Sequence, residues 1–208
     1  MQVTAIEARR KSLLALYIDG EYAVSLDRST LEENGIKVGT ELDDCTLRLL
    51  IQKSVENRAK SKALWLLSYR DYTKKELKDK IGRDFTIEEA ERVSDRMEEL
   101  GLLNDERFAK KYAGDLLFVK HLSKKAAKYK MLQRGIANEL CDQVLDEIYI
   151  EPKEQIKEIL DKKYSKYLND EKGIKKTFSA LQRMGYGYSD IRSAMSEFTE
   201  EWIGTDEL

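Results

Sequence analysis

Apolar side chains recur every three or four residues through most of this chain, which is the spacing of one face of an α-helix. In the segment after residue 85, the apolar positions i, i+3, i+7 and i+10 are Ala90, Val93, Met97 and Leu100. Over residues 59–198 the pattern returns roughly every fifty residues. We therefore predict tandem units built from short helices.

Each of three units is predicted to contain three helices. The first helices cover residues 59–69, 106–119 and 153–168, and the second helices cover residues 74–81, 124–134 and 172–184. The third helices follow Phe85, Gly135 and Gly185. A unit of this size buries one small apolar cluster and leaves its flanks partly exposed, so we expect neighbouring units to stack.

Residues that favour helix ends support these boundaries. The segments Thr73–Glu76 and Thr86–Glu89 both match the capping box, in which Thr and Glu satisfy each other's backbone N–H groups. Gly135 and Gly185 stand where a second helix would end in a left-handed residue. Pro152 suits the first turn of a helix, where it costs no hydrogen bond.

The front of the chain has a different pattern. Residues 13–26 hold two β-rich runs around Asp19-Gly20, a dipeptide that tolerates the positive φ values of a tight hairpin turn. Residues 3–9 alternate as an additional strand would, residues 29–35 suit a short helix, and a charged helix is expected around residues 46–60.

The predicted fold is therefore mainly α-helical. It consists of tandem three-helix repeats in an elongated array, preceded by a small β-hairpin or sheet module. The expected domains are the β-rich module with its short helix over residues 1–55 and three-helix repeats over residues 56–104, 105–150 and 151–208, the last with a C-terminal tail.

Composition excludes several classes of function. The 37 Lys and Arg residues against 39 Asp and Glu residues give a net charge of −2, so attraction to phosphate must come from local clustering. Cys45, Cys141 and His121 form no zinc motif or disulfide framework, and we expect no cofactor and a reducing, cytoplasmic setting. No membrane span or secretory signal is recognised. Without a glycine-rich phosphate loop or convergent catalytic groups, the chain is not expected to be an enzyme.

The most conspicuous charge feature lies between Asp115 and Glu139, where no acidic residue occurs. Its basic residues are Lys120, Lys124, Lys125, Lys128, Lys130 and Arg134. They could form a positive face for an acidic protein surface or for DNA phosphates, which would make binding sensitive to salt. The alternative is an ordinary solvated helix face.

Three stretches in register carry a resemblance to a known family: Arg70–Leu77, Leu100–Tyr112 and Leu132–Ile136. With the tandem units, they make the chain resemble RecX, the bacterial regulatory proteins of the RecA recombinase. The front hairpin is similar to the extension of RecX proteins from Gram-positive bacteria. Residues 119–123 depart from the pattern, because the family commonly has a glycine before the second helix of the middle unit.

Structural roles are expected for the residues of these family motifs. Arg70 and Tyr72 suit a helix–helix joint, Asp105 suits a helix N-terminus, and Phe108 and Tyr112 suit a core. The full set is Arg70, Tyr72, Thr73, Glu76, Leu77, Gly101, Asp105, Phe108, Tyr112 and Gly135.

The resemblance implies a role in recombination, DNA repair and the SOS response. Proteins of this family bind along the RecA–DNA filament, limit its extension, and reduce ATP hydrolysis and strand exchange. The implied partners are RecA and its nucleoprotein filament, with DNA contacted in that context and no membrane, and we expect a monomer. The basic residues from Lys120 to Arg134 are the candidate filament contacts. Two alternatives stay open, a stand-alone DNA-binding helical module and a helical scaffold for another protein.

Overall fold

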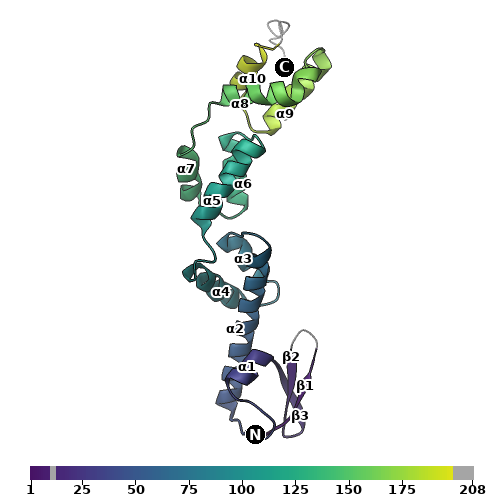
Figure 1. The fold of residues 1–208 in the computed structure, drawn as a ribbon, viewed down its shortest axis with the longest axis vertical. Helices are drawn as coiled ribbons and strands as arrows, with labels where there is room; N and C mark the ends of the chain where they lie inside the picture. Colours follow the sequence, from purple (N-terminus) through teal and green to yellow (C-terminus); the bar gives the residue numbers. More distant parts are fainter. Residues whose placement is uncertain (10–12, 199–208) are drawn as a thin grey trace. The chain divides into compact units, whose positions relative to one another are not determined.

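The computed structural model describes residues 1–9 and 13–198 (Figure 1). The chain divides into two compact parts, Met1–Asn104 and Asp105–Leu208. As predicted, the fold is mainly α-helical with three-helix domains and a small N-terminal antiparallel sheet. No helix within the described ranges is long and apolar enough to cross a bilayer.

The N-terminal sheet has the strand order β1-β2-β3. Its strands are β1 (Val3–Ala8), β2 (Leu13–Ile18) and β3 (Glu21–Asp27). Asp19 and Gly20 both have positive φ, 50° and 87°, and so form the tight turn that their sequence predicts. Helix α1 (Arg28–Glu33) follows, and its first turn is capped by the Asp27 carboxylate, which accepts a hydrogen bond from the Thr30 backbone N–H at 3.0 Å.

One long helix serves two cores. Helix α2 (Asp44–Tyr69) places Leu50 in the core beneath the sheet, and its later residues Ala59 and Ala63 lie in the next core along the chain. The charged helix and the first helix of the first repeat, expected separately, are thus continuous. The expected domain boundary after residue 55 falls inside this helix.

The remaining helices group into three sets, each with its own apolar cluster. The first three-helix set is the second half of α2 with α3 (Lys74–Ile81) and α4 (Ile87–Glu99). The second set is α5 (Asp105–Gly114) with η2 (Asp115–Val119), α6 (Lys124–Gln133) and α7 (Asn138–Asp146). The third set is α8 (Pro152–Ile159) with η3 (Leu160–Tyr164) and η4 (Ser165–Tyr167), α9 (Glu171–Arg183) and α10 (Tyr188–Met195).

Equivalent core positions recur about fifty residues apart. Between the second and third sets, the buried pairs are Ala127 and Thr177, Met131 and Leu181, Ile136 and Tyr186, Cys141 and Ile191, and Val144 and Ala194. Between the first and second sets, they include Ala59 and Ala109, Ala63 and Ala113, and Leu77 and Ala127. The repeated sequence pattern is therefore a repeated core.

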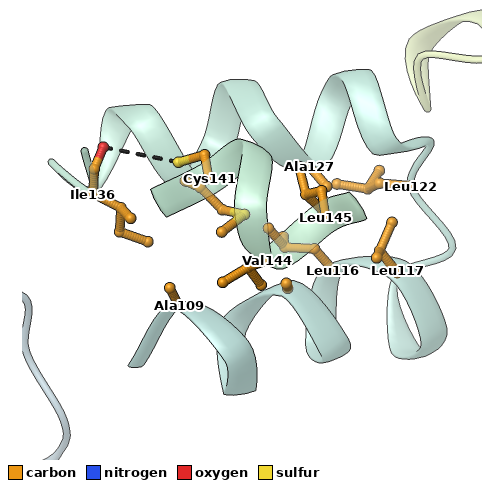
Figure 2. Close-up of a cluster of buried hydrophobic side chains, with 11 residues drawn as sticks. Ala109, Leu116, Leu117, Leu122, Ala127, Ile136, Cys141, Val144 and Leu145 are labelled. Carbon is orange, nitrogen blue, oxygen red and sulfur yellow. Dashed lines mark hydrogen bonds between the residues drawn. The ribbon is translucent and has the colours of Figure 1, made fainter. Parts of the chain in front are cut away.

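The first helices of the second and third sets end differently from the sequence prediction. Each was expected as one α-helix, but α5 continues into the π-helical turn η2, and α8 continues into the π-helical turn η3 and the 3₁₀ turn η4. In η2 the consecutive residues Leu116 and Leu117 are both fully buried. Figure 2 shows both in the core of the second set, with Leu117 next to Leu122.

Candidate partner-binding surface

Helix α6 carries most of the predicted basic residues, and local signals define it. Its N-cap is Ser123, whose hydroxyl accepts a hydrogen bond from the Ala126 backbone N–H at 3.2 Å. Its C-cap Arg134 precedes Gly135, which has φ of 82° as predicted for a residue that ends a helix in the left-handed conformation. Ala127 and Met131 face the core and are fully buried.

The basic residues lie on two flanks of α6. Successive helical residues are rotated by about 100°, so Lys128 and Lys130 point about 200° apart. Lys124 and Lys128 lie on one side of the buried stripe, with Lys125 beyond them on the solvent side. Lys130 and Arg134 lie on the other side. The residues predicted as one basic face therefore form two groups.

Tyr112 of α5 organises one of these groups. The Lys120 ammonium lies 5.9 Å and the Arg134 guanidinium 5.2 Å from the centre of its ring. An aromatic face attracts cations, so the half-buried ring holds two positive side chains in one place. Phe108 packs beside Tyr112, with ring centres 5.6 Å apart. We call Lys120, Lys130 and Arg134 the Tyr112 flank.

The other group lies on the side of α6 where Asp142 of α7 is found. The Lys128 ammonium forms an ion pair with the Asp142 carboxylate at 2.5 Å. Lys124 is half-buried, whereas Lys125 is exposed. We call Lys124, Lys125 and Lys128 the α7 flank. Because Asp142 partly neutralises Lys128, the α7 flank offers a weaker positive field than its sequence indicates.

The turn before α6 explains the departure from the family pattern. His121 has φ of 52°, a left-handed conformation that glycine adopts without steric cost. Its carbonyl oxygen accepts a hydrogen bond from the Tyr186 hydroxyl at 3.0 Å. Burial lowers the pKa of His121 below its usual value, and the nearby positive charge of Lys163 lowers it further. The hydrogen bond from Tyr186 of the third set thus stabilises this turn, although no glycine is present.

The first family motif forms a joint between α2 and α3. The Arg70 guanidinium lies 3.7 Å from the centre of the Tyr72 ring and donates hydrogen bonds to the Glu76 carboxylate at 3.1 Å and to the Asp71 carbonyl oxygen at 2.8 Å. Buried Thr73 caps α3, its hydroxyl accepting from the Glu76 backbone N–H. These contacts make the motif a packed corner.

Two of the lysines of α3, Lys74 and Lys78, bind neighbouring carboxylates. Lys74 contacts Asp95 at 2.8 Å and Glu98 at 2.6 Å, and Lys78 contacts Glu91 at 2.9 Å, all on α4. The bond to Asp95, then that to Glu98, raises the pKa of Lys74 well above its usual value. These lysines are therefore weaker candidates for a partner than those of α6.

The other family-motif residues lie at structural positions. Leu77 is fully buried in the first set, Gly101 has φ of 68° after α4, and Asp105 is the first residue of α5. The contacts of the Tyr112 ring with Lys120 and Arg134 were not predicted, since the sequence indicated only a core residue. Its nearness to Arg134 depends on how α5 packs against α6, and no local pattern shows that.

The fold defines a class: tandem three-helix domains behind a small sheet. Along the described residues, no three His, Cys, Asp or Glu side chains gather where they could hold a metal ion. Residues 59–97 match the family model described as RecX, first three-helix domain, and residues 104–145 match RecX, second three-helix domain.

Comparison with individual proteins extends the match over almost the whole chain. The regulatory protein RecX of Caldanaerobacter subterraneus subsp. tengcongensis is 31% identical, with 94% of this chain and 99% of that protein covered. That of Clostridium tetani is 26% identical, with 94% of each covered. A crystal structure of regulatory protein RecX has the same fold, with a TM-score of 0.65 at 23% identity over 94% of this chain and 98% of that one. The chain belongs to the RecX family.

Proposed function

We propose that this protein is a non-enzymatic regulator of the RecA recombinase. It binds the RecA–DNA filament, limits its extension, and lowers ATP hydrolysis and strand exchange. The observation that carries this proposal is the family match along 94% of the chain, because that match includes the sheet as well as the three-helix sets. The contacts with a filament come from more than one three-helix set. Because the sets are linked in one chain, each contact raises the effective concentration for the next, and several weak contacts together give a higher affinity.

The second set contributes the basic contacts. The Tyr112 flank is the stronger candidate, because the aromatic ring positions Lys120 and Arg134 before any partner arrives. The α7 flank contributes less, since Lys128 already pairs with Asp142. All six basic residues remain within the proposed surface, and its partner is acidic RecA surface or filament phosphate.

Charge reversal in matched pairs tests this surface. One variant combines Lys120→Glu with Lys130→Glu on the Tyr112 flank, and its control combines Lys124→Glu with Lys125→Glu on the α7 flank. Both change the net charge equally. The first pair is expected to raise the concentration that half-inhibits RecA ATP hydrolysis on single-stranded DNA by about tenfold, equivalent to about 1.4 kcal/mol. The second pair is expected to have a smaller effect.

Thermal unfolding of each variant shows whether the fold is retained. If neither pair changes the dose response, and reversal of all six charges leaves it unchanged too, the basic surface has no part in regulation. Binding to bare single- and double-stranded DNA at two salt concentrations separates this function from that of a stand-alone DNA-binding module. The latter binds tightly without RecA and loses affinity steeply as salt rises.

A further inference from the structure

A groove of about 950 Å³ runs along α9 in the third set. One wall carries Tyr164 and Tyr167 from the η3–η4 segment, and the other side follows α9 as far as Arg183. Its volume lies at the upper end of the range typical of small-molecule sites. None of the basic residues proposed above lines it.

A buried hydroxyl lies in the lining of this groove. Thr177 is 1% exposed, and its Oγ1 has no hydrogen-bond partner among the described residues. The equivalent core positions of the other two sets hold the apolar residues Leu77 and Ala127. A buried hydroxyl without a partner is unfavourable, so an apolar residue would suit packing better here too. In the lining of a groove, this hydroxyl is available to a ligand that supplies the missing hydrogen bond.

The aromatic wall is held against α9 by a glycine. A Cβ atom on Gly173 would overlap the Tyr167 carbonyl oxygen, so only glycine allows the η4 segment to cross α9 at this point. Tyr167 remains 59% exposed, and its ring centre lies 6.4 Å from that of Tyr164 at an interplanar angle of 60°. An exposed ring fixed by backbone packing can stack with a flat ligand.

The groove is also positively charged. Its lining residues include four cations, Lys172, Lys175, Lys176 and Arg183, and one carboxylate, Glu171, which pairs with Lys175 at 2.6 Å. Lys172, Lys176 and Arg183 have no ion-pair partner in the part of the chain that the structure describes. Their spacing along α9, four and then seven residues, places them in one stripe.

We propose that the α9 groove binds a nucleotide. The phosphate lies against Lys176 and Arg183 and accepts a hydrogen bond from the Thr177 hydroxyl, while the base stacks on Tyr167. A purely apolar ligand would not use the cations, and a simple carboxylate would not use the rings. Phosphate joined to an aromatic base uses both. This chemistry is shared by a free nucleotide and by one unit of a single strand.

Binding assays on the full chain without RecA test the groove. The probes are a fluorescein-labelled oligothymidylate of about 15 nucleotides, followed by anisotropy, and dTTP, followed by calorimetry. The combined change Lys176→Glu and Arg183→Glu is expected to weaken binding at least about tenfold, and Tyr167→Ala about fivefold or more. The control, Lys75→Glu with Lys80→Glu on α3, has the same net charge and is expected to stay within about twofold.

The two probes distinguish the source of the nucleotide. Groove-dependent binding of dTTP identifies a free-nucleotide site, and groove-dependent binding of the oligonucleotide alone identifies a strand site. Either result supports the proposal. The proposal fails if the wild-type protein binds neither probe, or if the groove variants bind as the α3 control does.

Thr177→Val is a further variant, which is expected to fold. Valine keeps the shape and removes the unpartnered hydroxyl, so the variant is expected to unfold at a higher temperature than the wild type while binding the nucleotide several-fold more weakly. Unchanged binding would show that the Thr177 hydroxyl does not contact the nucleotide. Because RecA is absent from these assays, failure here leaves the proposed regulation of RecA untouched.

Discussion

Gly185 has no room for a side chain. A Cβ atom there would lie 2.5 Å from the Ser123 hydroxyl oxygen and 2.6 Å from the Ala126 Cβ atom, and its φ of 90° disfavours any other residue. Gly185 follows α9, whereas Ser123 and Ala126 belong to the start of α6. This residue thus allows the second and third sets to meet, with the Ser123 hydroxyl donating a hydrogen bond to the Gly185 carbonyl oxygen at 2.8 Å.

Gly185→Ala is expected to lower the free energy of unfolding by about 3–5 kcal/mol, since steric overlap adds to backbone strain. Gly101→Ala is the matched control, because Gly101 has φ of 68° but nothing within 4 Å of an added Cβ atom. Only strain applies there, and a loss of about 1 kcal/mol is expected. Urea unfolding followed by circular dichroism measures both. Equal losses would show that the contact with α6 is unimportant.

His121 makes stability depend on pH. Burial, then the charge of Lys163 with a smaller contribution from Lys162, lowers its pKa in the folded state, while Glu158 opposes the shift. The unfolded chain therefore takes up the proton more readily than the folded one. The contribution of neutral His121 to the free energy of unfolding is fully present above the unfolded pKa of about 6.5. This contribution is lost as the pH falls towards the lower pKa of the folded state.

His121→Asn removes this titration, and Asn tolerates the left-handed conformation. Between pH 7.5 and pH 5, the free energy of unfolding of the wild type is expected to fall more than that of the variant. His121 is the only histidine, so its NMR titration gives the folded pKa directly. A midpoint at or above that of an unstructured histidine would contradict the assignment.

At the scale of helices and strands, local signals predicted most of the fold. Helix α3 has the predicted bounds, Thr86 and Glu89 form the predicted capping box, and Asp19-Gly20 forms the predicted turn. These features depend on neighbouring residues, whose chemistry is visible in sequence. The predicted periodicity likewise gave most core positions, such as Ala90, Val93 and Met97, but Leu100 at the end of that stripe is 45% exposed.

Features that depend on tertiary packing were not predictable in this way. The continuity of α2 across two cores and the π-helical turns η2 and η3 arise from how elements pack, and helical periodicity does not distinguish them from ordinary helix ends. The candidate site shows the same limit. The run of basic residues between Asp115 and Glu139 is obvious in the sequence. That these residues fall into two groups is seen only when the buried side of α6 is known. Thr177 was not predicted as a site residue. A threonine at a core position is unusual only if its hydroxyl has no hydrogen-bond partner, and the sequence does not show whether a partner is present.

At the scale of the whole molecule, the two compact parts have separate cores. The apolar clusters of the sheet and the first set contain only residues before Asn104, and those of the second and third sets contain only residues after it. Cooperative unfolding requires shared buried contacts. We therefore expect damage to one part to leave the stability of the other nearly unchanged.

Trp65 offers a direct reporter for the first part. It lies on α2 beside Tyr69, with ring centres 4.8 Å apart, and the other tryptophan, Trp202, lies outside the described residues. In a Trp202→Phe background, tryptophan fluorescence follows Met1–Asn104 alone, whereas circular dichroism follows the helices of both parts. Adding Gly185→Ala is expected to split the urea transition seen by circular dichroism, because only the second and third sets lose stability. The fluorescence midpoint should stay where it was. If the urea midpoint seen by fluorescence falls together with the midpoint seen by circular dichroism, the two parts unfold as one cooperative unit. Their separate cores would then not make them independent.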